Sequence, residues 1–250
     1  LWRRALELGA DRLATGHYAR VVSDPARGRA GLRTAVDAGK DQTYFLFMLR
    51  RTQLERTLFP VGDLTKAEVR AHAAARGLPV ADKPESMDVC FVVDGDTAAF
   101  VERHAPAGAV RPGVIVDEAG KDIGRHGGVH HFTIGQRRGL GLAGGPRRYV
   151  GALDAATATV RVVANPGLQA RGLVAREVSW VDGPPAPGER LAVRIRHRHA
   201  PVPASVTVTG DDAARVAFDG VGPAVTPGQA AVFYAGDRVL GGGWIAEALP

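Results

Sequence analysis

The spacing of apolar and polar residues changes along the chain and divides it into three parts. Residues 1–94 predict helices that alternate with short strands, which favours an α/β domain with a parallel sheet. Residues 95–165 predict short strands separated by Gly and Pro turns, a small central β domain. Residues 166–250 alternate with period two in regularly spaced runs, which is typical of a small antiparallel β-barrel. We therefore expect an α/β plus β fold with three domains.

Local patterns place elements within the first part. The predicted elements are an opening helix stopped by Gly9, strands at 11–15 and 31–36, an aromatic helix at 41–49, and helix starts at the capping boxes Thr52–Glu55 and Thr65–Glu68. The last helix is expected to end at Arg76, because Gly77 and Pro79 follow it. The chain opens inside a helical pattern with neither a Met nor a cap, so we expect it to begin within a longer protein.

The second and third parts are richer in strands. The predicted elements are a helix at 97–104, strands at 113–116, 151–154, 158–163, 190–196 and 204–208, and a linker at 165–167. Period two would place Arg194, Arg196 and Arg198 on one face of a strand. A row of three guanidinium groups needs water or an anion, and we interpret it as facing RNA in preference to a merely solvated face.

Composition narrows the class of protein. The net charge is +6, from 32 basic and 26 acidic residues, and the basic residues cluster, which suits a polyanionic partner; a composition generally rich in Arg is the alternative. The single Cys excludes a disulfide scaffold and fits a reducing cytosol. No apolar run approaches membrane-spanning length. We expect a cytoplasmic protein without a membrane partner.

Two short polar segments of the first part are candidate binding sites. Gly16-His17-Tyr18 directly follows a strand, and the carboxyl edge of a parallel sheet is where ligands bind. The alternative is an ordinary strand-to-loop turn. Lys40-Asp41-Gln42 precedes the aromatic helix, so it is either a helix N-terminus or a contact for phosphate or a base.

Cys90 follows the polar run 82–86, which reads as a loop. On such a loop, with Lys83 nearby, it would act as a nucleophilic thiolate. Val89 and Phe91 flank it, so a buried structural cysteine is the alternative, and the segment alone does not separate the two.

A Gly/Arg-rich stretch at 136–148 contains no acidic residue and suits phosphate groups, with a solvated hairpin as the alternative. It follows His126, His130 and His131. These histidines lack a regular ligand spacing with a fourth ligand, so no metal site is expected.

Taken together, long stretches resemble the tRNA-specific 2-thiouridylases, also called tRNA-uridine 2-sulfurtransferases. They are A-T-G-H-Y-A-R at 14–20, G-K-D-Q-T-Y-F-L at 39–46, L-F-P-V-G-D-L-T-K at 58–66, E-S-M-D-V-C-F at 85–91, H-F-T-I-G-Q-R-R-G-L-G at 131–141, V-T-P-G-Q-A-A-V-F-Y at 225–234 and L-G-G-G at 240–243. The resemblance implies an adenine-nucleotide-binding α/β domain, a central β domain that binds tRNA and a C-terminal barrel. It also implies ATP and Mg²⁺, adenylation of the wobble uridine and sulfur transfer from a cysteine persulfide.

The resemblance also assigns roles to individual residues. It implies that Cys90 carries the persulfide and that Gly16 contacts ATP. The implied tRNA contacts are His17, Lys40, Asp41, Gln42, Arg196, His197 and Gln229. The implied partners are tRNA and a sulfur-donor protein.

The sequence departs from the family pattern at its start. The S-G-G-x-D-S pyrophosphate loop and the first catalytic cysteine, which would pair with Cys90, do not occur in it. We therefore expect this chain alone neither to bind ATP properly nor to complete turnover. The alternatives are a non-catalytic RNA-binding module derived from the enzyme and a related ligase acting on a small molecule; the barrel argues against the ligase.

Overall fold

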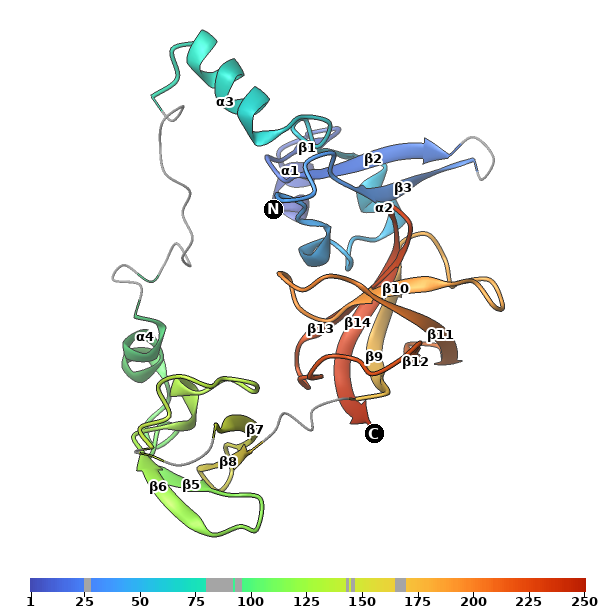
Figure 1. Ribbon diagram of the computed structural model, residues 1–250. Helices are drawn as coiled ribbons and strands as arrows, with labels where there is room; N and C mark the ends of the chain where they lie inside the picture. The colour runs from blue at the N-terminus through green and yellow to red at the C-terminus, as the bar shows by residue number, and fades with distance from the viewer. Residues whose placement is uncertain (25–27, 80–91, 93–95, 143, 145–146, 165–169) are drawn as a thin grey trace. The chain divides into compact units, whose positions relative to one another are not determined.

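The computed structural model describes residues 1–24, 28–79, 92, 96–142, 144, 147–164 and 170–250. They belong to two compact units, which Figure 1 shows as ribbons. Residues 1–83 and 170–250 form the first unit, and residues 84–169 form the second, called the central unit below. Among the described helices, none has the length and apolar character needed to cross a membrane.

The C-terminal strands of the first unit close into an antiparallel barrel. They are β9 (Gly172–Trp180), β10 (Leu191–Arg194), β11 (Val202–Gly210), β12 (Ala213–Phe218), β13 (Ala230–Ala235) and β14 (Arg238–Leu249). Each pairs with the next in the order β13-β10-β11-β12-β9-β14, and β14 pairs back with β13. Alternate side chains, such as Val193 and Phe233, are fully buried inside. The predicted barrel is confirmed.

Glycines in the middle of β14 let neighbouring chain segments approach closely. A Cβ on Gly241 would overlap the carbonyl oxygen of Ser179 on β9. A Cβ on Gly242 would lie 2.7 Å from the carbonyl oxygen of Ala231 and 2.8 Å from the ring of Phe47. The glycine run therefore brings the aromatic segment around Phe47 against the barrel wall.

The first residues of the unit contribute a small parallel sheet and short helices. Their elements are α1 (Trp2–Glu7), β1 (Leu13–Ala14), α2 (Arg51–Leu54), β4 (Thr57–Leu58) and α3 (Lys66–Ala75). Strand β1 pairs with β4 in parallel, with Leu13 opposite Thr57. The expectation of helices with parallel strands is confirmed here.

The second capping box is confirmed at α3. The N–H of Glu68 donates to the Thr65 hydroxyl at 3.3 Å, and the N–H of Thr65 donates to the Glu68 carboxylate at 2.7 Å. Helix α3 ends before Gly77, which has a left-handed φ of +61°.

The first capping box is misplaced by two residues. Helix α2 begins at Arg51, because the Gln53 side chain accepts the N–H of Arg50 at 2.9 Å and thereby caps the helix two residues earlier than Thr52 would.

The strand predicted at 31–36 is present but belongs to another sheet. It is β3 (Arg29–Thr34), and it forms an antiparallel hairpin with β2 (Ala19–Asp24). Strand β3 also pairs antiparallel with β14 of the barrel. The expectation of a parallel sheet is wrong for this strand, because Leu32 is fully buried in a core that it shares with Val239 of β14.

The helix predicted at 41–49 is also wrong. Only a single 3₁₀ turn, η1 (Thr43–Phe45), forms there. The N–H of Gln42 donates to the carbonyl of Tyr18 at 3.0 Å, and the carboxylate of Asp41 accepts the Thr43 hydroxyl at 2.8 Å. Hydrogen bonds of this kind compete with the helical ladder and hold the segment in an irregular conformation.

The described residues of the central unit form the helix α4 and a four-stranded sheet. Its elements are α4 (Thr97–His104), β5 (Gly113–Val116), β6 (Asp122–His126), the 3₁₀ turn η2 (Val129–His131), β7 (Tyr149–Asp154) and β8 (Thr159–Val163). The sheet order is β6-β5-β8-β7, with β5 and β8 parallel. The predicted helix and strands are confirmed, while β6 was missed because Ile123 is its only large apolar residue. The predicted linker at 165–167 lies outside the described residues.

Candidate functional site

The loop after β1 holds the first predicted site residues. Gly16 is exposed, and a Cβ built on it would meet no atom within 4 Å, so a ligand can approach its backbone. The ring of His17 is held by the Thr15 hydroxyl, 2.9 Å from its Nδ1, and stands edge-on to Phe59. The loop therefore combines open backbone with a fixed imidazole at the carboxyl end of a parallel strand, as predicted.

A second predicted segment lies directly beside this loop. The N–H of Tyr18 donates to the side-chain oxygen of Gln42 at 3.0 Å, and the N–H of Gln42 donates back to the carbonyl of Tyr18 at 3.0 Å. Lys40 is half-buried just before it. The structure thus brings Gly16 and His17 next to the segment Lys40–Gln42.

Asp41 connects this segment to the barrel. Its carboxylate is 3.2 Å from the guanidinium of Arg194, and the two side chains are 3% and 16% exposed. It also accepts the N–H of Ala35 at 3.1 Å. Asp41 is therefore committed to contacts inside the protein that fix the end of β10, and a contact with tRNA stays a prediction.

The guanidinium of Arg194 also lies 5.3 Å from the centre of the Tyr234 ring. Burial raises the pKa of Tyr234 to about 12, so its phenol stays protonated. The phenol oxygen is 3.3 Å from the hydroxyl of Thr43. A cation, a carboxylate, an aromatic ring and a hydroxyl thus form one buried polar network.

The predicted row of arginines on one strand face is wrong. Strand β10 ends at Arg194, and the chain then turns, with the N–H of His199 donating to the carbonyl of Arg196 at 3.1 Å. The turn keeps Ile195 buried, and it directs the Arg196 guanidinium to the hydroxyl of Thr226 at 2.8 Å. Arg198 is exposed at the turn.

An aromatic pair lies at the same turn. The ring of His197 is tilted over Phe45, with centroids 4.6 Å apart, and Phe45 is 55% exposed. Burial, followed by the charges of Arg194 and Arg198, lowers the pKa of His197 from its ordinary 6.5, so this imidazole is neutral at neutral pH. Sequence reasoning missed Phe45, although an aromatic residue close behind Lys40–Gln42 was a signal that could have revealed it.

Gln229 completes the group. It is exposed in the turn before β13, where its N–H donates to the carbonyl of Thr226 at 3.2 Å. Thr226 is also the residue that accepts Arg196. The first unit therefore links residues from four distant segments by direct contacts, whereas Cys90 and Lys83 lie in 80–91, outside the described residues.

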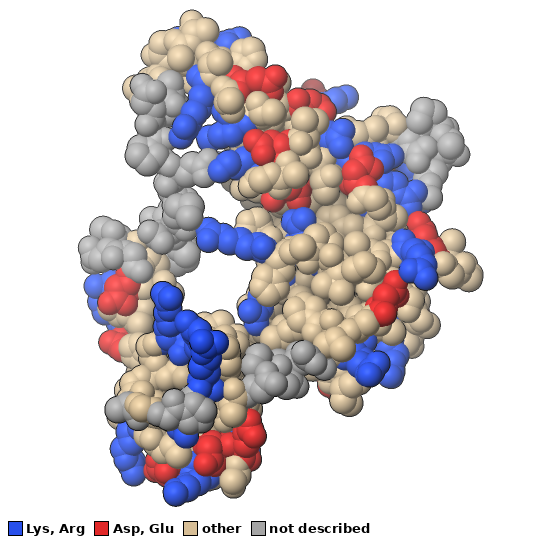
Figure 2. Space-filling view, in the orientation of Figure 1, with Lys and Arg blue, Asp and Glu red and all other residues tan. Residues whose placement is uncertain are grey.

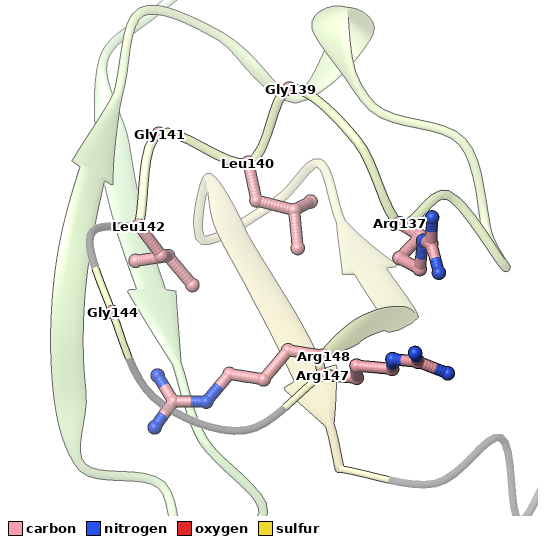
Figure 3. Close-up of a pocket in the computed structure, with 8 residues that line it drawn as sticks. All are labelled: Arg137, Gly139, Leu140, Gly141, Leu142, Gly144, Arg147 and Arg148. Carbon is pink, nitrogen blue, oxygen red and sulfur yellow. The ribbon is translucent and has the colours of Figure 1, made fainter.

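The Gly/Arg-rich stretch of the central unit lines an open hollow of about 540 Å³, shown in Figure 3. The residues around it are Arg137, Gly139, Leu140, Gly141, Leu142, Gly144, Arg147 and Arg148. In Figure 3, Leu140 and Leu142 point toward the side on which Arg147 and Arg148 lie. Figure 2 shows basic side chains gathered on this unit. Since these lining residues include three arginines and no carboxylate, the hollow suits an anion.

Three family models match the chain in succession. The description "tRNA methyl transferase HUP domain" covers residues 1–94. "tRNA methyl transferase PRC-barrel domain" covers residues 98–164, and "Aminomethyltransferase beta-barrel domain" covers residues 170–245. All three descriptions refer to methyl transfer, whereas the full-length relatives of this chain are named 2-thiouridylases.

The tRNA-specific 2-thiouridylase MnmA of Solibacter usitatus is 50% identical over 247 residues, which are 95% of this chain and 66% of the relative. The enzyme of the same name from Geobacter metallireducens is 49% identical over 252 residues, 100% of this chain and 67% of the relative. The one from Chloroflexus aggregans is 49% identical over 245 residues, with 98% and 68% coverage. The chain belongs to the tRNA-specific 2-thiouridylase family.

The chain spans about two thirds of the length of these 2-thiouridylases. The three matched domains agree with the expected fold: an α/β part, a central β part and a C-terminal barrel. In this chain, Gly16, His17 and Lys40–Gln42 fall in the HUP-domain match, and Arg196, His197 and Gln229 fall in the barrel match.

Proposed function

We propose that this protein takes part in ATP-dependent 2-thiolation of the wobble uridine of tRNA, in the cytoplasm, with a sulfur-donor protein as partner. One observation carries the proposal. The residues assigned to tRNA by resemblance are far apart in the sequence, yet the segments that carry them are linked within one unit: Gln42 bonds to Tyr18 beside His17, His197 packs on Phe45, and Arg196 and Gln229 both bond to Thr226.

The resemblance assigns Cys90 the sulfur-transfer step. The O2 oxygen of uridine is a poor leaving group, and its bond to the adenylyl group of ATP, formed with release of pyrophosphate, makes it a good one. The terminal sulfur of a persulfide on Cys90 then attacks C2, and AMP departs with the oxygen. The S–S bond of the persulfide breaks when a second thiol attacks Cys90 and forms a disulfide with it.

ATP and Mg²⁺ enter the proposal through the resemblance. Gly16 is the described residue assigned to ATP, and its open backbone fits close approach of a nucleotide. The S-G-G-x-D-S loop does not occur in these residues, so for residues 1–250 alone we propose no adenylation and expect no micromolar binding of ATP in a calorimetric titration. We assign none of the described residues to the binding of Mg²⁺.

The tRNA-binding part of the proposal rests on two features of different kinds. Phe45 and His197 offer an exposed aromatic surface on which an unpaired base can stack. The arginines around the hollow of the central unit offer charge for backbone phosphates. An anticodon loop presents both unpaired bases and the phosphates of its backbone.

The test is formation of 2-thiouridine in transcribed tRNA by the polypeptide made from the complete reading frame, with ATP and a persulfide donor. Thiolated tRNA is detected by its retardation in a mercury-containing gel. The expected result is thiolation by the wild type and none by Cys90→Ser, with unchanged tRNA affinity. Binding of tRNA without thiolation by either protein would favour the non-catalytic alternative, and absence of tRNA binding would refute the proposal.

A further inference from the structure

A cluster of three potential metal ligands lies in the central unit, and the proposed function uses none of these three residues. Glu102 comes from α4, and His130 and His131 come from η2. The Nε2 atom of each imidazole is 3.2 Å from the same carboxylate oxygen, Oε1 of Glu102. All three ligand atoms lie within 4.8 Å of one another.

The local backbone explains why the two imidazoles lie together. Turn η2 is tight, with the N–H of His131 donating to the carbonyl of Gly128 at 3.3 Å, and the two rings are 4.1 Å apart. A Cβ on Gly128 would overlap the His130 ring, and one on Gly127 would lie 3.8 Å from Nε2 of His131. Gly128 therefore makes room for the His130 ring, whereas a side-chain carbon at Gly127 would only touch the His131 ring.

We propose that Glu102, His130 and His131 bind one divalent transition-metal ion of the zinc type. Bonds of about 2.0–2.1 Å place two ligand atoms of a tetrahedron about 3.3 Å apart, close to both observed nitrogen–oxygen separations. Two imidazoles and one carboxylate suit zinc and its neighbours, whereas Mg²⁺ and Ca²⁺ prefer oxygen ligands alone.

The exposure of the ligands matches a site that exchanges with solvent. The side chains of His131 and Glu102 are 40% and 47% exposed, and that of His130 is 13% exposed. An ion can enter from the exposed side, and water supplies the fourth ligand there. The sequence predicted no metal site, because Glu102 is 28 residues from His130 and no spacing rule connects them.

The competing explanation is a metal-free ion pair in which both imidazoles share the Glu102 carboxylate. Calorimetric titration of Zn²⁺ into an untagged, metal-free chain separates the two. The chain carries Cys90→Ser in every variant, so that a thiolate does not compete for the ion. The expected result is one saturable site per chain, together with a thermal midpoint that rises with Zn²⁺.

Matched variants locate the site. Glu102→Gln and His130→Gln should weaken Zn²⁺ binding at least as much as the roughly 10–100-fold that loss of an outer-shell partner costs. His104→Gln is the control, because His104 lies on the same helix α4 but its ring is stacked on Phe100, outside the cluster. With Co²⁺ as the probe, the visible absorption bands of a low-symmetry site should appear in the parent and control and be absent from both cluster variants.

Far-UV circular dichroism without metal verifies that each variant is folded. If Glu102→Gln or His130→Gln fails to fold, His131→Gln replaces it, because the His131 side chain is more exposed than that of His130. Absence of saturable Zn²⁺ binding by the folded parent chain overturns the proposal. Equal affinity in the parent and the folded cluster variants overturns it as well.

Discussion

Asp41 and Arg194 are 153 positions apart in the sequence, yet their side chains meet at 3.2 Å in the interior of the first unit. The pair joins the segment Lys40–Gln42 to the end of β10, where the chain turns toward Arg196 and His197. Its position makes it a structural support for residues on both sides that we assign to tRNA.

Replacing Asp41 should therefore destabilise the first unit. Asp41→Ala leaves the Arg194 guanidinium, 16% exposed, without its carboxylate, and loss of one partner of a buried ion pair costs about 3–5 kcal/mol. Urea denaturation measures the free energy of unfolding. Asp219→Ala is the control, because its partner Arg190 is 89% exposed and such pairs contribute about 0–1 kcal/mol. Equal losses in the two variants would contradict the role of Asp41.

Phe45→Ala should weaken tRNA binding without destabilising the protein. Phe45 is 55% exposed, so it contributes little to the core, and loss of an aromatic stacking partner costs about 1–3 kcal/mol per base. Fluorescence anisotropy with labelled tRNA measures the affinity. The control is Met48→Ala, which removes a side chain of similar exposure (52%) from the same segment. If both variants bind like the wild type, no base stacks on this surface.

Stability should fall as the solution becomes acidic, in part through His197. Burial and nearby arginines lower the pKa of His197, and burial with Arg196 lowers that of His199. Just below pH 6.5, the unfolded chain therefore binds more protons at these sites than the folded chain does, and stability is lost as the pH falls. His197→Gln should reduce the difference in unfolding free energy between about pH 7.5 and pH 5.5. An unchanged difference would show that His197 titrates alike in both states.

Gly242→Ala should destabilise the barrel. The added Cβ would lie 2.7 Å from the carbonyl oxygen of Ala231 and 2.8 Å from Phe47, so the backbone of β13 or the aromatic segment must shift. Overpacking of this kind costs about 1–3 kcal/mol or more. The matched variant Gly220→Ala meets no atom within 4 Å and should leave the thermal midpoint nearly unchanged. Similar midpoints for both variants would mean that β14 accommodates the methyl group.

The Arg147→Ala/Arg148→Ala double variant should reduce the salt dependence of tRNA binding. Each phosphate contact that is lost should lower the slope of log K against log salt concentration by roughly 0.7–0.9. Binding measured over a range of KCl concentrations gives the slope. Arg125→Ala is the control in the same unit, because that side chain is 79% exposed and paired with Asp122. A slope equal to that of the wild type would place these arginines away from the RNA.

Features that depend on neighbouring residues could be predicted from the sequence. The Thr65–Glu68 capping box and the alternating barrel strands are set by residues a few positions apart, and the structure contains both. The same holds for the loop after β1, whose place at a parallel strand end follows from local pattern.

Features that depend on contacts between residues far apart in the sequence could not be predicted from local sequence patterns. The segment 41–49 has apolar residues that suit a helix, but the partners of Asp41 and Gln42 are Arg194 and Tyr18, which no local pattern reveals. Glu102 likewise meets His130 only after α4 and η2 have come together.

The pairing of β3 with β14 has a consequence for how the chain is made. Arg33 lies opposite Arg238 and Leu32 opposite Val239, so a strand synthesised before the central unit must wait for one that is synthesised after it. The central unit is continuous in sequence and emerges from the ribosome in between. Since domains fold as units during synthesis and long-range pairing is slow, the central unit folds first. A nascent chain that has not yet reached β14 therefore carries a folded central unit between two segments of the first unit that have not yet paired.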